Sequence, residues 1–213
     1  MRNILLTGFE PFDGQAINPS EEIAREINDA TIARHKVVGA LLPCVFGAAI
    51  KELKHQIKLH EPAIVICLGQ AGGRAEITPE RVAINIDDAR IPDNAGQQPV
   101  DKPIAKDGPA AYFSTLPIKA IVQELRKHDI PAAVSQTAGT FVCNHVFYGL
   151  MHELALHRSE VRGGFIHVPF VPEQTTSEKP SLPFEKMTAA IRWAIAASIE
   201  YRRDIKSGGG QVS

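Results

Sequence analysis

The chain has 213 residues, 44% of them hydrophobic and 22% charged, which is an ordinary globular composition with enough length for one sizeable core. The formal net charge is −1 and the basic and acidic residues are interspersed, so neither nucleic acid nor an anionic membrane is expected as a partner. No apolar run approaches the roughly 18 residues that span a bilayer, no export signal opens the chain, and the three cysteines are widely spaced, which together predict a soluble cytoplasmic protein without disulfides.

The first elements along the chain are a strand and a helix. Residues 3–9 form a short apolar run typical of a buried strand. Asn18 as cap, Pro19 at the first helical position and Glu21 three residues after the cap predict a helix that ends near Ile27.

Strands and helices then alternate through the rest of the chain. "AIVICLG", ending at Gly69, is apolar without interruption, which a strand buried on both faces requires. The other expected elements are strands at residues 36–42, 81–86, 132–136 and 163–170 and helices at residues 45–60, 118–128, 143–157 and 183–203.

This alternation predicts an α/β sandwich with a twisted, mainly parallel and possibly mixed sheet. We expect a single domain at residues 1–205 and a flexible tail at residues 206–213, where Gly and Ser dominate. Functional sites in such folds gather at the carboxyl ends of strands. The loops expected there are residues 8–14, 69–80, 137–144 and 167–174.

Of the three cysteines, Cys143 is the best candidate nucleophile. Cys67 lies inside an apolar strand and is interpreted as an inert core residue, and Cys44 lacks the small, turn-prone neighbours of an open site. Cys143 follows "TAGT", and with Thr140 as helix cap its thiol would lie in the first helical turn. The positive helix end would there stabilise a thiolate and bind an oxyanion.

A thiol nucleophile needs a proton carrier, for which His167 is the best candidate. His145 is two residues from Cys143 on the expected helix and would point away from it. His167 ends an apolar strand, where a buried core imidazole is the alternative interpretation. The histidines in charged segments expected on the solvated surface are excluded, namely His35, His55, His60 and His128.

A carboxylate commonly orients such an imidazole, and the segment after the core strand offers two. Glu76 and Glu80 could each be a solvated loop charge. Thr78 and Pro79 place Glu80 against the next apolar strand, which favours Glu80 as the partly buried one.

Neither a metal nor a nucleotide is favoured as a cofactor. The histidines of "HELALH" are five residues apart rather than four, and Cys143 and His145 cannot converge from one helix, so zinc is a minor alternative. "GQAGGR" matches neither of the glycine-rich phosphate-binding patterns.

Two long segments resemble the signatures of the pyroglutamyl-peptidase I family, also called pyrrolidone-carboxylate peptidases. They are "GQAGGRAEITPERVAIN" at residues 69–85 and "SQTAGTFVCN" at residues 135–144. "LLTGFEPFDGQAINPS" and "DNAGQQPVD" are similar to that family too, and the similarity extends from residue 3 to about residue 201.

The resemblance implies a cysteine peptidase that removes an N-terminal pyroglutamyl residue from peptides without a metal or other cofactor. It implies a three-layer α/β/α sandwich and a homo-oligomer, often a tetramer. Cys143 would be the nucleophile, His167 its base and acid, and Glu80 the third member of the catalytic group.

The pyroglutamyl head is a flat, neutral lactam, which suits a pocket with apolar walls and few hydrogen-bonding groups. Without the family resemblance, ordinary core packing is an equal alternative for Phe9 and Phe12, and a surface ion pair is the alternative for Arg90. Residues 91–103 are either a mobile flap or an oligomer contact. The residues that the resemblance places at the substrate are Phe9, Phe12, Gln70, Arg90, Phe141 and Val142.

Two rival functions remain. One is a metal-assisted amidohydrolase with Cys143 and His167 as ligands. The other is a non-catalytic α/β domain that binds small molecules through "GQAGG".

Overall fold

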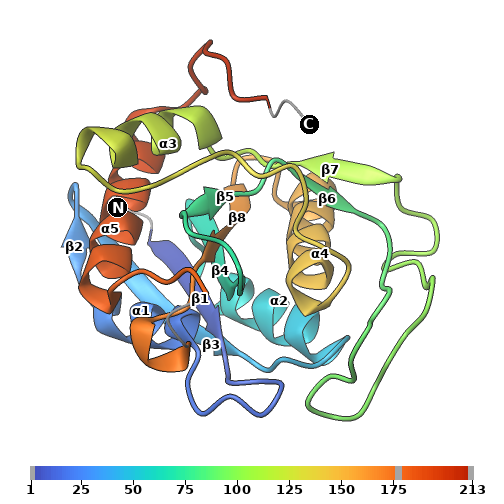
Figure 1. Ribbon diagram of the computed structural model, residues 1–213. Coiled ribbons are helices and arrows are strands. Elements are labelled where there is room, and N and C mark those ends of the chain that lie inside the picture. The colour runs from blue at the N-terminus through green and yellow to red at the C-terminus, as the bar shows by residue number, and fades with distance from the viewer. Residues whose placement is uncertain (1–2, 176–178, 211–213) are drawn as a thin grey trace.

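A six-stranded mixed sheet forms the centre of the molecule (Figure 1). The computed structural model describes residues 3–175 and 179–210. The sheet order is β2-β3-β1-β4-β8-β5, with β3, β1, β4 and β8 mutually parallel and β2 and β5 antiparallel to their neighbours. The strands are β1 (Ile4–Phe9), β2 (Thr31–Ile32), β3 (His35–Leu42), β4 (Ile64–Gln70), β5 (Thr78–Pro79) and β8 (Arg162–Val168).

Helices cover both faces of this sheet, which confirms the α/β/α sandwich (Figure 1). One apolar cluster joins the sheet to α1 (Pro19–Ile27), α3 (Ile118–Lys127) and α5 (Phe184–Glu200). A second cluster joins the opposite face to α2 (Ala48–His60) and α4 (Val142–His157). A short helical turn, η1 (Pro172–Gln174), follows β8.

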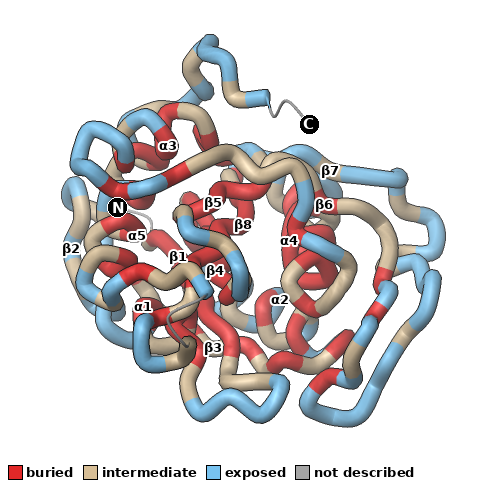
Figure 2. The backbone as a smooth tube through the Cα atoms, in the orientation of Figure 1, coloured by how far each residue is buried: buried red, intermediate tan, exposed pale blue. Residues whose placement is uncertain are grey.

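The apolar run of β4 is explained by this double cover. Ile64, Ile66 and Leu68 belong to the first cluster, whereas Val65 and Cys67 belong to the second. Side chains alternate between faces along a strand, so a strand between two helical layers must be apolar at every position. Figure 2 shows this central strand buried along its length.

Most of the expected elements are present, but two expected strands need correction. The strand expected at residues 81–86 is shorter, and as β6 (Val82–Ile84) it pairs with β7 (Ala111–Phe113) in a separate two-stranded ribbon. The strand expected at residues 132–136 is wrong: Ala132 and Ser135 form only isolated bridges. Their partners, Ile77 and Glu80, flank the two-residue strand β5, which is too short to sustain a ladder.

The end of the chain contacts the body of the protein as far as it is described. The Ser207 carbonyl accepts a hydrogen bond from Lys119 Nζ (2.6 Å), and the Gly209 carbonyl accepts one from Arg81 Nη2 (2.9 Å). Of the tail for which flexibility is expected, Ser207 and Gly209 therefore have hydrogen-bond partners in the body of the protein, and residues 211–213 lie outside the described residues. Within the described ranges, none of the helices has the length and apolar character that a membrane crossing requires.

The start of α1 tests how local sequence fixes an element. Asn18 Oδ1 accepts hydrogen bonds from the Ser20 backbone N–H (3.1 Å) and hydroxyl (2.8 Å), and Asn18 Nδ2 donates to the Glu10 carbonyl (3.1 Å). Asn18→Ala removes the helix cap and leaves these buried groups unpaired. We expect a loss of about 1–2 kcal/mol in the free energy of unfolding, measured by urea titration.

Asn18→Asp is the control for that change. It keeps the acceptor and loses only the donation to Glu10, so its loss should be clearly smaller. Equal losses in the two variants would contradict capping as the cause.

Candidate active site

Cys143 and His167 lie on the same face of the sheet. Gly69 and His167 are directly opposite each other on the parallel strands β4 and β8, so their Cβ directions share a face. A Cβ placed on Gly69 would lie 2.8 Å from Cys143 Sγ. The absence of a side chain at Gly69 is therefore what lets the thiol settle against the strand end beside His167.

Glu80 is held next to His167 by backbone pairing. β5 runs antiparallel to β8 with Thr78 opposite His167, and the Glu80 N–H then donates to the Phe165 carbonyl (2.9 Å). This places Glu80 Oε1 2.7 Å from His167 Nδ1. A carboxylate accepts only from a protonated nitrogen, so Nδ1 carries the hydrogen and Nε2 is the nitrogen left to take up a proton.

The imidazole is strongly desolvated. His167 is 3% exposed and its ring centroid lies 4.8 Å from that of Phe165. Burial lowers the pKa of His167 below its ordinary value, the hydrogen bond and charge of Glu80 act in the opposite direction, and the positive charge of Arg74 lowers it further. His167 is therefore a neutral base at neutral pH.

Cys143 lies in the first turn of α4, as expected, but the cap differs from the expected one. Phe141 is the cap residue and offers no side-chain hydrogen bond. Thr140 lies one position too early and instead donates its hydroxyl to the Asp88 carbonyl (2.7 Å). The first-turn N–H groups of α4 therefore have no capping side chain, and they point to where an oxyanion could bind.

The surroundings of Cys143 do not favour ionisation of its thiol. Cys143 is partly exposed, but burial of its sulfur raises its pKa above the ordinary value, and the negative charge of Glu80 adds to this while Arg74 opposes it. The expectation of a thiolate stabilised by the helix start is therefore not supported. A neutral thiol beside a neutral imidazole describes this site.

The other two cysteines behave as the sequence predicts. Cys44 and Cys67 are buried in the second apolar cluster, and burial raises the pKa of each to about 12. Neither has the combination of partial exposure and a nearby imidazole that distinguishes Cys143.

The residues after Cys143 fasten α4 to neighbouring loops. Asn144 is fully buried and pairs with the backbone of Ile84 through both amide atoms (3.0 and 2.9 Å). His145 Nδ1 lies 2.8 Å from Asp87 Oδ2, and its Nε2 accepts from the Gly47 N–H (2.9 Å). The role of Asn144 was not apparent from the sequence.

Among the described residues no three His, Cys, Asp or Glu side chains are close enough to hold a metal ion.

Three aromatic rings gather near Cys143. The Phe141 centroid lies 6.0 Å from that of Phe12 and 5.4 Å from that of Phe46. Phe46 was missed by the sequence reasoning, although it sits in the loop that opens α2. Phe9 and Val142 are 2% and 1% exposed and belong to the second apolar cluster, so in this structure they form part of the core.

Gln70 and Arg90 are less closely tied to the thiol. Gln70 ends β4, and its Oε1 accepts from Gln174 Nε2 (2.8 Å). Arg90 is exposed, two residues after Asp88, whose N–H donates to the Thr140 carbonyl (3.0 Å). The segment that carries Arg90 is thus attached to the turn before α4, and the side chain itself has no polar partner among the described residues.

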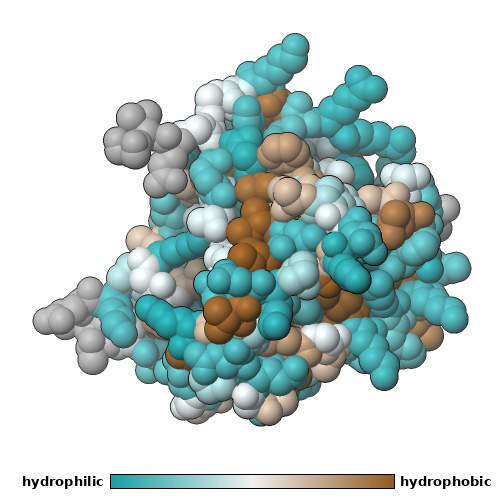
Figure 3. Space-filling model, turned by 90° about the vertical axis from the view of Figure 1, so that its right-hand side faces the viewer, coloured by the Kyte–Doolittle hydropathy of each residue, from teal (hydrophilic) through white to brown (hydrophobic). Residues whose placement is uncertain are grey.

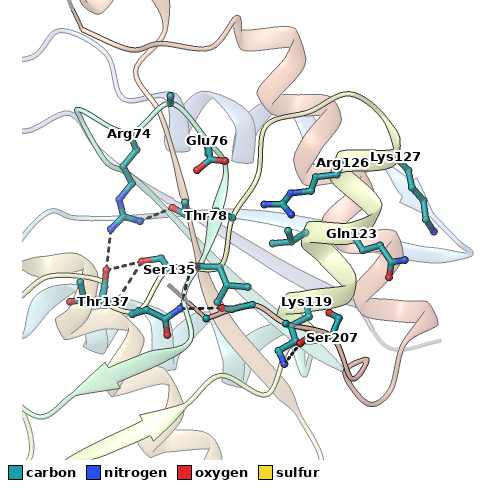
Figure 4. A pocket seen from close by; sticks show the side chains of 18 residues that line it. Arg74, Glu76, Thr78, Lys119, Gln123, Arg126, Lys127, Ser135, Thr137 and Ser207 are labelled. Carbon is teal, nitrogen blue, oxygen red and sulfur yellow. Dashed lines mark hydrogen bonds between the residues drawn. The ribbon is translucent and has the colours of Figure 1, made fainter. Parts of the chain in front are cut away.

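A cavity of about 1090 Å³ lies between the segment that follows β4 and helix α3 (Figure 4). Arg74 and Thr78 line it on one side, α3 lines the other, and the end of the chain closes it below. Cys143 and His167 are not among its lining residues. Arg74 is the residue that connects this cavity to the candidate site, since it also forms an ion pair with Glu80 (2.7 Å).

A thiol beside an imidazole that a carboxylate orients is suited to nucleophilic acyl transfer, the chemistry of a thiol hydrolase. The comparisons with known proteins agree with this class. A family model described as pyroglutamyl peptidase matches residues 2–201, and the chain belongs to that family.

Relatives match over the full chain. Pyrrolidone-carboxylate peptidase from Cupriavidus taiwanensis is 55% identical, with 100% of both chains covered. The crystal structure of pyroglutamyl peptidase I from Bacillus amyloliquefaciens is 51% identical with a TM-score of 0.96, covering 98% of this chain and 100% of that one. Pyrrolidone carboxyl peptidase from Thermococcus litoralis is 42% identical with a TM-score of 0.95, at 98% and 100% coverage.

The state of the thiol can be measured by alkylation. With a raised pKa, the thiolate fraction of Cys143 at neutral pH is lower than that of an ordinary thiol. Its rate of reaction with iodoacetamide should therefore rise by about tenfold per pH unit up to and beyond pH 9, followed by mass spectrometry of the Cys143 peptide.

Cys143→Ser reports the background from Cys44 and Cys67. A plateau of the Cys143 rate between pH 6 and pH 7 would show a stable thiolate and contradict the neutral pair.

Proposed function

We propose that this protein is a cysteine peptidase that removes an N-terminal pyroglutamyl residue from peptides through a thioester intermediate. Membership in the pyroglutamyl peptidase family supports the reaction. The observation that carries the mechanism is the Glu80–His167 hydrogen bond of 2.7 Å on the sheet face against which the Cys143 thiol lies.

In the first step, Cys143 Sγ attacks the carbonyl carbon that joins pyroglutamate to the next residue. The thiol proton passes to His167 Nε2 as the carbon–sulfur bond forms, and the first-turn N–H groups of α4 stabilise the oxyanion. Because thiol and imidazole are both neutral beforehand, charge separation arises only during attack, next to the Glu80 carboxylate that stabilises the imidazolium.

In the second step, the imidazolium returns its proton to the departing amine and the carbon–nitrogen bond breaks, which leaves a thioester on Cys143. His167 then accepts a proton from water as the water attacks the thioester. The carbon–sulfur bond then breaks and the imidazolium returns its proton to the sulfur, so that pyroglutamate is released and the neutral thiol and imidazole are restored. Neither step consumes a cofactor.

Apolar walls near Cys143 suit the flat lactam of the substrate. The half-buried rings of Phe12 and Phe141 form one wall, and Phe46 packs edge-on against Phe141. Gln70 and Arg90 are proposed as polar groups near the ring or the following residue. Phe9 and Val142 act by shaping the wall from the core side.

We further propose one catalytic domain at residues 1–205, a cytoplasmic location and a homo-oligomer, by analogy with the family a tetramer. Large apolar side chains on the surface support the assembly: Phe113 on β7 is 70% exposed and Val100 in the segment 91–103 is 60% exposed. Figure 3 shows a short hydrophobic band near the middle of a largely hydrophilic face, with further hydrophobic patches beside it.

The nucleophile can be tested by Cys143→Ser. The hydroxyl is a much weaker nucleophile than the thiol, so release of chromophore from a pyroglutamyl anilide should fall by at least about 10³-fold while the fold is retained. Circular dichroism and urea unfolding check the fold.

Two controls distinguish the cysteine peptidase from the rival functions. Cys44→Ser should keep activity, and a chelator should have no effect on the unmodified protein. Near-normal turnover by Cys143→Ser would refute the assignment, and loss of turnover with the chelator would favour the metal-assisted amidohydrolase.

Substrate selectivity tests the pocket. Prolyl anilide lacks the lactam carbonyl and carries a charged ring amine, so polar groups that serve the lactam would be left unpaired and the charge would be desolvated. We expect kcat/KM to be lower by at least about 10³-fold than for pyroglutamyl anilide. Comparable rates would contradict the lactam pocket.

A further inference from the structure

Arg74 makes three contacts that join the segments presenting Glu80 and Cys143. Its Nη1 donates to Glu80 Oε1 (2.7 Å) and Thr78 Oγ1 (2.6 Å), and its Nη2 donates to the Thr137 carbonyl (3.0 Å). Thr78 lies on β5, and Thr137 lies in the turn that leads into α4. Figure 4 shows the guanidinium pointing at both.

The buried carboxylate of Glu80 requires a positive charge close to it. The residue is 0% exposed, and among the described residues its Oε2 has no hydrogen-bond partner. Oε1 accepts from both His167 and Arg74, so one oxygen carries both contacts. A buried carboxylate without a partner of opposite charge is costly, and the imidazole beside it is neutral.

We propose that Arg74 is a positioning residue for the reaction: its guanidinium balances the charge of Glu80 and fixes the carboxylate in the orientation that receives the Nδ1 hydrogen of His167. This inference rests on the proposed roles of Glu80, Cys143 and His167. The Arg74 side chain is 29% exposed and lines the cavity beside α3, which Cys143 and His167 do not line, so it acts from outside the reacting atoms.

The charged and titratable groups around His167 are few, and this gives the effect a definite sign. Among the described residues they are Glu80 after β5, Arg74 after β4 and the Cys143 thiol on α4. Arg74 lowers the pKa of His167. Its removal should therefore raise that pKa, protonate the base at higher pH and move the acid limb of kcat/KM upward.

The experiment compares Arg74→Gln with Arg74→Lys, and uses Arg126→Gln as a matched control. Arg126 lines the same cavity and donates to the Ala132 carbonyl (2.8 Å), but it does not touch Glu80. For Arg74→Gln we expect the acid limb to shift upward by about one pH unit, which is about tenfold in proton affinity, with kcat affected more than KM. Arg74→Lys should restore most of the profile, and Arg126→Gln should match the unmodified protein.

A second readout does not depend on turnover. In a Cys143→Ala background, NMR titration of the His167 ring nitrogens reports its pKa with and without Arg74→Gln. An upward shift supports the inference even if the proposed peptidase reaction fails. An unchanged His167 titration, or an Arg74→Gln profile reduced equally at all pH values, would overturn it.

Discussion

The hydrogen bond between Glu80 and His167 is the interaction on which the candidate site depends. It fixes the tautomer of the imidazole, so that Nε2 is the nitrogen available to the thiol. Both side chains are almost completely buried, and a buried carboxylate and imidazole keep their partners because water cannot replace them. The ion pair of Arg74 with Glu80 supplies the charge that this burial requires.

The fold brings the three segments together through a few backbone contacts. The two residues of β5 pair with β8 and carry Glu80 to the side of His167, and the glycine at position 69 leaves space for Cys143 against the end of β4. Asn144 and His145 then fix the start of α4 to the loops around it. The site therefore depends on the ends of the sheet more than on its core.

Burial also decides the protonation states. It raises the pKa of the thiol and lowers that of the imidazole, which favours the neutral pair and delays charge separation until substrate attack. A helix start alone argues for a thiolate, whereas burial of the sulfur raises the pKa of Cys143 and so acts in the opposite direction. The local sequence predicts the effect of the helix start. It cannot predict the desolvation, because desolvation depends on which distant segments cover the sulfur.

The sequence by itself determined the alternation of elements, the cap at Asn18, the doubly buried strand β4 and the core position of Cys67, because these follow from local spacing and composition. It favoured Glu80 only weakly and missed Arg74, Phe46 and Asn144. Their roles rest on contacts with residues distant in the chain, such as Thr137 for Arg74 and Ile84 for Asn144. Only the tertiary structure decided these, because hydrogen bonding and desolvation depend on segments that meet after folding.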